Sequence, residues 1–156
     1  MTGVTGSTGG AAVAADRILV VDFGAQYAQL IARRVREAKV FSEIVPHDLT
    51  ASEFADRRPS GIIFSGGPAS VHVDGAPRID PGIYELGVPI LGICYGLQLL
   101  VHRLGGKVES AEDREYGRAQ LVVEVDDPVL GSADRSGERV VWMSHGDRVL
   151  SLPEGF

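Results

Sequence analysis

The sequence predicts an α/β domain with an open, mostly parallel, twisted sheet that carries helices on both faces. Short apolar segments alternate with helical patterns along the first two thirds of the chain, which is the order of parallel strands and crossover helices. Loops rich in glycine and proline follow several of these segments. Near the C-terminal end, residues 119–125 and 138–143 alternate apolar with polar positions, which predicts antiparallel strands with one solvated face.

Four apolar segments supply the predicted strands of the parallel sheet, and turn or loop residues end each of them. They are Arg17–Asp22, Val40–Val45, Gly61–Ser65 and Val88–Gly92.

Helical patterns fill the intervals between these strands. The first helix follows Gly24, the second spans 51–58 with Thr50 or Ser52 as its N-cap, a helical turn covers 83–86, and the last helix begins after Cys94. Two of the helices have apolar residues at a spacing near 3.6, which we expect to face the sheet. In the first these are Tyr27, Leu30, Ile31, Val35 and Ala38, and in the last they are Leu97, Leu100, Val101 and Leu104.

Composition limits the classes of function. The chain has 156 residues, 44% hydrophobic and 23% charged, and a net charge of -6, so general affinity for nucleic acid is not expected. One cysteine cannot form an internal disulfide, which suits a reducing cytoplasm, and no apolar run approaches the length of a membrane span. Residues 1–15 have neither charge nor large apolar side chains and predict a disordered tail, so the domain spans 16–156.

The single cysteine, Cys94, lies in the pattern Gly92-Ile93-Cys94-Tyr95-Gly96 between a short strand and a helix. This is the arrangement of a nucleophile elbow with sulfur in place of oxygen. Glycines at the two flanking positions avoid collisions across so tight a turn. An isolated cysteine is more often a buried apolar residue, but the paired glycines and the strand-to-helix setting favour a catalytic nucleophile.

The elbow predicts two further properties. The helix N-terminus beside the sulfur favours thiolate over thiol, so we expect a lowered pKa for Cys94. The backbone N–H of Tyr95 points at any oxyanion that forms next to the sulfur. Ligands of open parallel sheets bind at the carboxyl ends of the strands, so the loops 22–24, 65–68 and the elbow should converge on one crevice. Gly66-Gly67 could there supply a second N–H to an oxyanion hole.

The sequence shows no clear general base for this nucleophile. His102 lies eight residues along the helix from Cys94, about 12 Å of axial rise, and cannot reach the sulfur. His47 and His72 lie in loop contexts typical of surface histidines. His145 has Ser144 and Asp147 nearby and is the better candidate for a role in the site, including that of a stand-in base.

Six stretches together resemble the glutamine amidotransferase domain found at the N-terminus of GMP synthases. The elbow and the Gly-Gly-Pro turn are shared by the wider class I, or triad, amidotransferases, and the first and last stretches point to the GMP synthases. They are ILVVDFGAQYAQLIARRVRE at 18–37, GIIFSGGPASV at 61–71, GICYGLQLL at 92–100, LGGKVE at 104–109, REYGRAQ at 114–120 and VWMSHGD at 141–147.

The resemblance implies hydrolysis of glutamine through a Cys-His-Glu triad with Cys94 as nucleophile, and a class I amidotransferase fold. Gly67 and Tyr95 match the positions that donate oxyanion-hole N–H groups. The residues that match glutamine-contacting regions are Gln98, Gly117, Arg118, Ala119, Gln120, Ser144, His145 and Asp147. No metal and no cofactor are implied for this domain.

The resemblance also implies what lies beyond this chain. The family's catalytic His and Glu follow the SHGD motif in a stretch that would come after Phe156, and so does an ATP-pyrophosphatase (synthetase) domain that uses ATP and Mg. The implied partners are glutamine, that synthetase domain and a second copy in a homodimer. The 156 residues are therefore expected to be a partial amidotransferase domain that is inactive by itself and to belong to an enzyme that aminates XMP to GMP.

Two other interpretations stay open at the level of sequence. The first is a non-catalytic regulatory or binding module that keeps the amidotransferase fold without its base. The second is a subunit of another triad-class amidotransferase, such as an anthranilate or carbamoyl-phosphate synthase, against which the stretches DFGAQY and WMSHGD argue.

Overall fold

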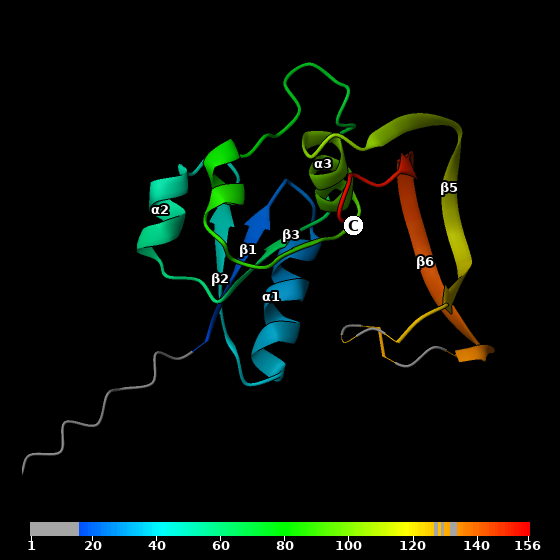
Figure 1. The fold of residues 1–156 in the computed structure, drawn as a ribbon, viewed down its shortest axis with the longest axis horizontal. Helices are drawn as coiled ribbons and strands as arrows, with labels where there is room; N and C mark the ends of the chain where they lie inside the picture. Colours follow the sequence, from blue (N-terminus) through cyan, green and yellow to red (C-terminus); the bar gives the residue numbers. More distant parts are fainter. Residues whose placement is uncertain (1–15, 127, 129, 132–133) are drawn as a thin grey trace, which may run out of the picture.

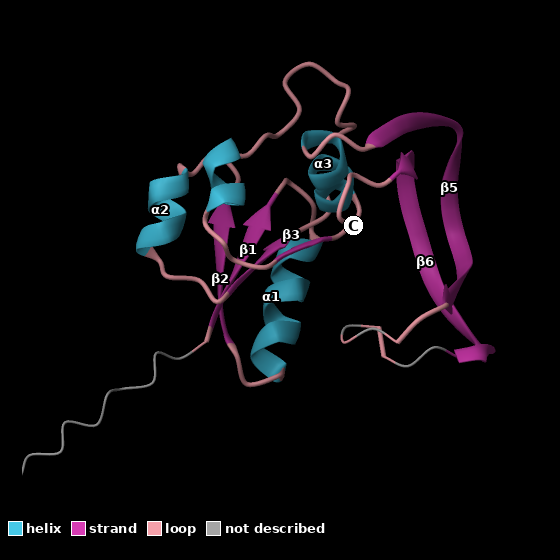
Figure 2. Cartoon of the chain, viewed as in Figure 1, coloured by secondary structure: helices cyan, strands magenta, loops and turns pink. Residues whose placement is uncertain are grey.

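The computed structural model describes residues 16–126, 128, 130–131 and 134–156, with the side chains of 111–116, 134–138 and 145 left aside. The predicted tail, 1–15, lies outside the described residues. Two parts follow one another along the chain, a parallel α/β sheet and then a long antiparallel hairpin (Figure 1). Figure 2 shows the hairpin strands standing to one side of the sheet, with helix α3 between the two parts.

The sheet has four parallel strands in the order β2-β1-β3-β4. Their bounds are Arg17–Asp22 for β1, Phe41–Pro46 for β2, Gly61–Phe64 for β3 and Ile90–Gly92 for β4. The predicted fold class and all four predicted strands are thus confirmed, each to within two residues at either end. Because β1, β3 and β4 are neighbours, the loops that follow them emerge side by side at one edge.

Successive residues of β1 point to opposite faces, and both faces are covered. Leu19 and Val21 belong to the larger apolar cluster, and Val20 belongs to a smaller one. Helix α1 (Tyr27–Glu37) covers the smaller cluster with Ala28 and Ala32. Helices α2 (Ala51–Asp56) and α3 (Tyr95–Arg103) and the 3₁₀ helix η1 (Pro81–Glu85) pack against the larger one. The alternation of buried side chains is that of a parallel sheet between two helical layers.

Thr50 caps α2, as one of the two predicted N-caps. Its hydroxyl accepts from the N–H of Glu53, while the Glu53 carboxylate accepts from the Thr50 N–H at 2.8 Å, which completes a capping box. The hydrogen bonds that the Thr50 N–H and hydroxyl donate to this carboxylate lower the pKa of Glu53.

The predicted buried faces of α1 and α3 are partly wrong. Tyr27 and Leu30 are exposed, and Ala28 and Ala32 occupy the buried positions. The small alanine side chains let α1 approach the sheet closely, so the larger residues beside them face away. Leu97 of α3 and its C-cap residue Leu104 are likewise exposed. The buried apolar residues of α3 are Tyr95, Leu99, Leu100 and Val101.

The antiparallel strands are much longer than predicted. β5 spans Lys107–Val123 and β6 spans Asp134–Ser151, so the segment 144–147 lies inside β6 rather than after a strand. Three irregularities of register, between 107/108, 110/115 and 121/123, interrupt the pairing. Such irregularities break the alternation of apolar and polar residues on which the prediction depended.

The close approach of α3 to β3 makes Gly96 sensitive to substitution. The Gly96 N–H donates to the Ser65 carbonyl at 3.1 Å, and a Cβ at position 96 would collide with the backbone of Phe64. Alanine gains up to about 1 kcal/mol of helix propensity over glycine, but forcing a carbon into packed backbone costs more.

We therefore expect Gly96→Ala to lower the free energy of unfolding by about 2 kcal/mol, measured by urea denaturation. The matched control is Gly66→Ala, because a Cβ there would only make an ordinary contact, 3.6 Å from the Cys94 Cβ. Equal stability of the two variants would contradict the collision.

Candidate active site

Cys94 occupies the turn between β4 and α3 and is the N-cap residue of that helix. Its backbone has φ 50° and ψ -113°, a conformation that non-glycine residues rarely adopt. Such a residue costs about 1–3 kcal/mol and persists where the surrounding structure fixes it. The Ile93 N–H donates to the Phe64 carbonyl at 3.0 Å, and the Gln98 N–H donates to the Cys94 carbonyl at 3.0 Å. These bonds hold the turn from both sides, which is the strained elbow that the sequence predicts.

The two glycines of the elbow are needed for close approach. A Cβ at Gly92 would lie 2.6 Å from the Cα of Leu97, within the helix that follows. A Cβ at Gly96 would strike the end of β3, as described above. Each glycine thus prevents a different collision, one with the helix and one with the neighbouring strand.

The Cys94 side chain is exposed at a cavity of about 830 Å³ between the sheet and the hairpin. The loop after β3 forms one wall of the cavity, and the start of α1 forms a second. The elbow and α3 form its floor, and the hairpin forms the wall opposite. Its lining residues include Tyr27, Leu30, Gly66, Gly67, Ser70, Cys94, Tyr95, Gln98, Ser110, Trp142, Ser144, Gly146 and Asp147.

Of the three loops expected to share one crevice, two meet at this cavity. The loop after β3 and the elbow line it together. The loop after β1 contributes Ala25, whereas Asp22, Phe23 and Gly24 line a separate hollow of about 410 Å³ with the end of β2. The buried ring of Phe23 lies against Tyr95, at 5.3 Å between ring centroids, and separates the two spaces. The expectation of a single crevice is therefore wrong for 22–24.

Burial raises the pKa of the Cys94 thiol above its ordinary value, and no charged side chain in the described part of the chain counters it. The lowered pKa expected from the helix N-terminus is therefore wrong for this arrangement. Among the described residues that line the cavity, none is His, Lys or Arg. The thiol has a strained and accessible position, but the cation or base that would ionise it is not among its described neighbours.

The described histidine side chains are engaged elsewhere. His47 Nδ1 lies 3.1 Å from the Arg78 carbonyl, and His72 Nε2 lies 3.0 Å from the Val108 carbonyl. The rings of His72 and His102 meet edge to face at 5.6 Å. His145 pairs with Glu115 in the hairpin backbone, but its side chain lies outside the described part, so its role as a stand-in base stays a prediction.

The family model for glutamine amidotransferase class-I matches residues 19–156 of this chain. The chain belongs to this family. The elbow cysteine, the Gly-Gly-Pro turn after β3 and the parallel sheet are therefore parts of a class-I amidotransferase domain.

Curated relatives of this amidotransferase carry the name GMP synthase [glutamine-hydrolyzing]. The protein of Lactobacillus acidophilus is 55% identical over 141 residues, which cover 90% of this chain and 27% of the relative. The protein of Aquifex aeolicus is 59% identical over 139 residues, which cover 89% of this chain and 27% of the relative. The chain thus spans 27% of the length of these relatives.

Solved structures agree on the amidotransferase fold. A Thermoplasma acidophilum protein, provisionally described as one of the subunits of a GMP synthase, superposes with a TM-score of 0.74 and 31% identity, covering 90% of this chain and 69% of that one. A glutamine amidotransferase from Methylobacillus flagellatus has a TM-score of 0.56 at 21% identity, covering 90% and 58%, and shows the fold alone.

The structure brings most of the predicted amidotransferase site residues to one cavity. Gly67 packs against Tyr95, since a Cβ at position 67 would lie 3.2 Å from Tyr95 Cγ. Neither backbone N–H donates to another group in the described part of the chain. The remaining predicted residues that line the cavity are Cys94, Gln98, Ser144 and Asp147.

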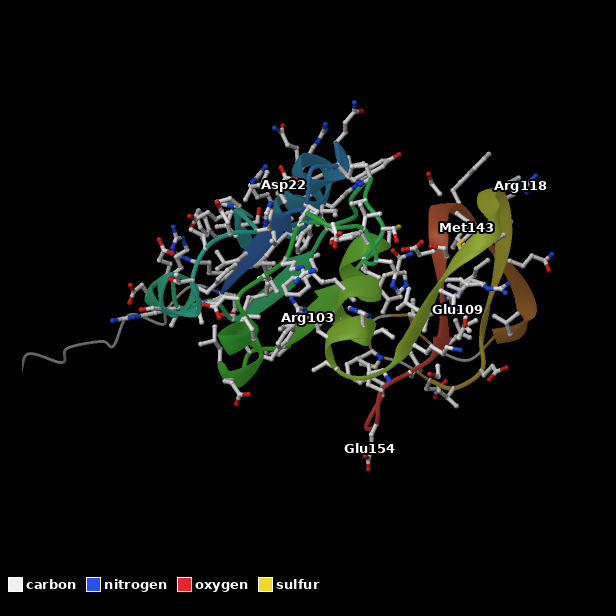
Figure 3. The ribbon with its side chains drawn as sticks, turned by 90° about the horizontal axis from the view of Figure 1, so that it is seen from above. Asp22, Arg103, Glu109, Arg118, Met143 and Glu154 are labelled. Carbon is white, nitrogen blue, oxygen red and sulfur yellow. The ribbon has the colours of Figure 1, made fainter. Side chains whose placement is uncertain are left out.

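Four predicted glutamine contacts do not reach the cavity. Gly117, Arg118, Ala119 and Gln120 lie in β5 and pair with residues 140–143 of β6. They are thus one strand further out than the cavity residues Trp142 and Ser144. Figure 3 shows Arg118 on the side of the hairpin that is turned away from the sheet. These four residues are not among those that line the cavity, so their role as glutamine contacts stays a prediction.

Sequence reasoning missed three large residues at the mouth of the cavity. Tyr27 and Leu30 come from α1, and Trp142 comes from β6 with 76% of its surface exposed. The apolar spacing of α1 placed the first two on its buried face, and no local pattern marked the third. Their position depends on how the hairpin meets α1, which is a contact between distant segments.

Two absences hold for the described residues alone. No group of three or more His, Cys, Asp or Glu side chains is placed to bind a metal ion. No helix there is both long enough and apolar enough to cross a membrane.

The raised pKa of Cys94 predicts how fast the thiol is alkylated. Because the thiolate is the nucleophile, iodoacetamide should react with the folded chain more slowly at neutral pH than with the same chain in urea. The rate should rise with pH through an inflection above that of the unfolded chain. An inflection at or below the unfolded value, measured by mass spectrometry of the labelled protein, would contradict the raised pKa.

Proposed function

We propose that this chain is the glutaminase part of a GMP synthase and that Cys94 is its nucleophile. The observation that carries the proposal is the strained elbow, which presents the only sulfur nucleophile of the chain to a cavity in a class-I amidotransferase fold. The names of the relatives support the further step to GMP synthase. Those names also weigh against a subunit of an anthranilate or carbamoyl-phosphate synthase.

In the proposed reaction the Cys94 thiolate attacks the side-chain amide carbon of glutamine. A carbon–sulfur bond forms, and the carbon–nitrogen bond then breaks as the nitrogen takes a proton and leaves as ammonia. Water attacks the resulting glutamyl thioester, releases glutamate and returns the thiol. Each attack places negative charge on the carbonyl oxygen, and the N–H groups of Gly67 and Tyr95 are free to stabilise it.

The ammonia would be consumed in the ATP-dependent amination of XMP to GMP. That step, with its ATP and Mg, belongs to a synthetase domain that we propose as the partner of this one, in a homodimeric enzyme. The single cysteine and the reducing conditions that a free thiol needs lead us to place the reaction in the cytoplasm.

A second candidate is a non-catalytic module with the same fold. Two observations favour this candidate for the 156 residues by themselves. The pKa of Cys94 is raised, and the described cavity residues include no base. The two candidates differ in whether glutamine is consumed at Cys94.

The Cys94→Ser variant of the complete gene product separates the two candidates. We expect it to lose formation of GMP from glutamine, XMP and ATP and to keep formation of GMP from added ammonium, because only the ammonia supply depends on the thiol. The 156-residue chain alone should release no glutamate above its own Cys94→Ser control. Undiminished use of glutamine by the variant would overturn the proposed function.

Gly67 tests the proposed oxyanion hole. A Cβ at this position would press on the Phe23 carbonyl at 3.0 Å and on Tyr95 at 3.2 Å, so Gly67→Ala must displace the loop and its N–H. Loss of one oxyanion donor costs about 10²–10³ in rate. We expect Gly67→Ala to lower glutaminase turnover of the complete enzyme by that order and Gly66→Ala to lower it much less. Equal losses, or none, would remove the role.

A further inference from the structure

Ser65 follows β3 directly and is completely buried, with 0% of its surface exposed. A buried hydroxyl is expected to be hydrogen-bonded, and this one has two partners. Its oxygen accepts from the Phe23 N–H at 3.4 Å, and it donates its proton to the Gly66 carbonyl at 3.1 Å. The direction of each bond is certain, because a backbone N–H only donates and a carbonyl oxygen only accepts.

The backbone of Ser65 is held as firmly as its side chain. Its N–H donates to the Val21 carbonyl at 3.2 Å, and its carbonyl accepts from the Gly96 N–H at 3.1 Å. The residue is therefore fixed by β1 on one side and by α3 on the other. The hydroxyl that bonds Gly66 thus stands on a rigid base.

The Gly66 carbonyl belongs to the same peptide group as the Gly67 N–H. In a trans peptide the carbonyl and the N–H point in opposite directions. Gly66 and Gly67 line the cavity of Cys94, whereas Ser65 is not among the lining residues. A carbonyl held by the buried hydroxyl is therefore turned away from the cavity. The N–H on the opposite side of the same peptide group is turned toward it.

This peptide group needs such a restraint. Neither glycine has a side chain, so steric hindrance limits its rotation little. In the described part of the chain, the Ser65 hydroxyl is the one donor to the Gly66 carbonyl. Further along the loop, the Val71 N–H donates to the carboxylate of Asp147 at 3.3 Å. Without the Ser65 bond, the peptide group between these anchors is free to turn its carbonyl oxygen into the cavity.

We infer that Ser65 is a positioning residue of the oxyanion hole, whose hydroxyl fixes the peptide group between Gly66 and Gly67 so that the Gly67 N–H faces the cavity. The inference rests on the proposed function, because that function gives the Gly67 N–H its role. Ser65 touches no substrate and acts only through the peptide group that it holds. A carbonyl oxygen in place of the N–H would repel the oxyanion rather than stabilise it.

The experiment measures glutamate release by the complete gene product with XMP and ATP, as kcat and KM for glutamine. Both attacks of the proposed reaction place charge on the same oxygen, so kcat depends on the oxyanion hole whichever attack is slower. Ser65→Ala keeps the Gly67 N–H but no longer fixes its direction. We expect kcat to fall about 10- to 100-fold, less than for loss of a donor outright, while KM stays within about threefold.

Ser42→Ala is the matched control. The Ser42 side chain is also buried, at 5% exposed, and its hydroxyl also donates to a backbone carbonyl, that of Ala32 at 2.8 Å. It lies on β2 and is not among the residues that line the cavity. Its loss removes a comparable buried hydrogen bond, so kcat for glutamine should not change. Formation of GMP from added ammonium should be the same in the parent and in both variants.

Ser65→Cys is the second variant, for the case that Ser65→Ala does not fold by circular dichroism. Its sulfur fills the space of the hydroxyl, but a thiol is a weak donor, so kcat should fall severalfold at unchanged KM. A kcat for the Ser65 variant no lower than that of Ser42→Ala would overturn the positioning role, and so would a rise in KM as large as the fall in kcat. A parent enzyme that releases no glutamate would instead overturn the proposed function.

Discussion

The structure depends on how closely α3 approaches the end of β3. The Gly96 N–H reaches the Ser65 carbonyl, and the Ile93 N–H reaches the Phe64 carbonyl, so the elbow is bonded to its neighbouring strand on both sides of Cys94. This contact forces the positive φ of Cys94 and directs the sulfur toward the cavity. Any side chain at Gly92 or Gly96 would break the contact. The position of the nucleophile thus depends on glycine at both positions, where the absence of a Cβ permits the close approach.

Local patterns predicted the parts of the fold that local forces determine. The four strands, the capped helix after Thr50 and the elbow each have a signature within about ten residues, and each lies where expected. The buried faces of the helices are harder to predict. In α1 the buried residues are Ala28 and Ala32, and a pattern based on large apolar residues does not mark alanine. The length of the hairpin was underestimated because register irregularities interrupt the alternation of its side chains.

The candidate site was predictable to the extent that it lies on single elements. Cys94, Tyr95 and Gln98 come from the elbow and its helix, and Gly67 comes from the turn after the adjacent strand. The cavity wall contributed by Trp142, the distance of 117–120 from the sulfur and the bonds of Asp147 all depend on where the hairpin lies. No single stretch of sequence encodes that placement. The pKa of Cys94 depends on the placement in the same way, since burial raises it.

Among the described residues, few polar connections join the hairpin to the rest of the domain, and they include those of Asp147 and the bond of His72 to the Val108 carbonyl. The strand β1, by contrast, is hydrogen-bonded on both edges and buried on both faces. The domain should therefore open at two levels of free energy. Amide hydrogens of β1 would exchange only on global unfolding, while the hairpin could detach as a unit and leave the elbow intact. Loss of substrate binding on heating would then precede loss of the sheet.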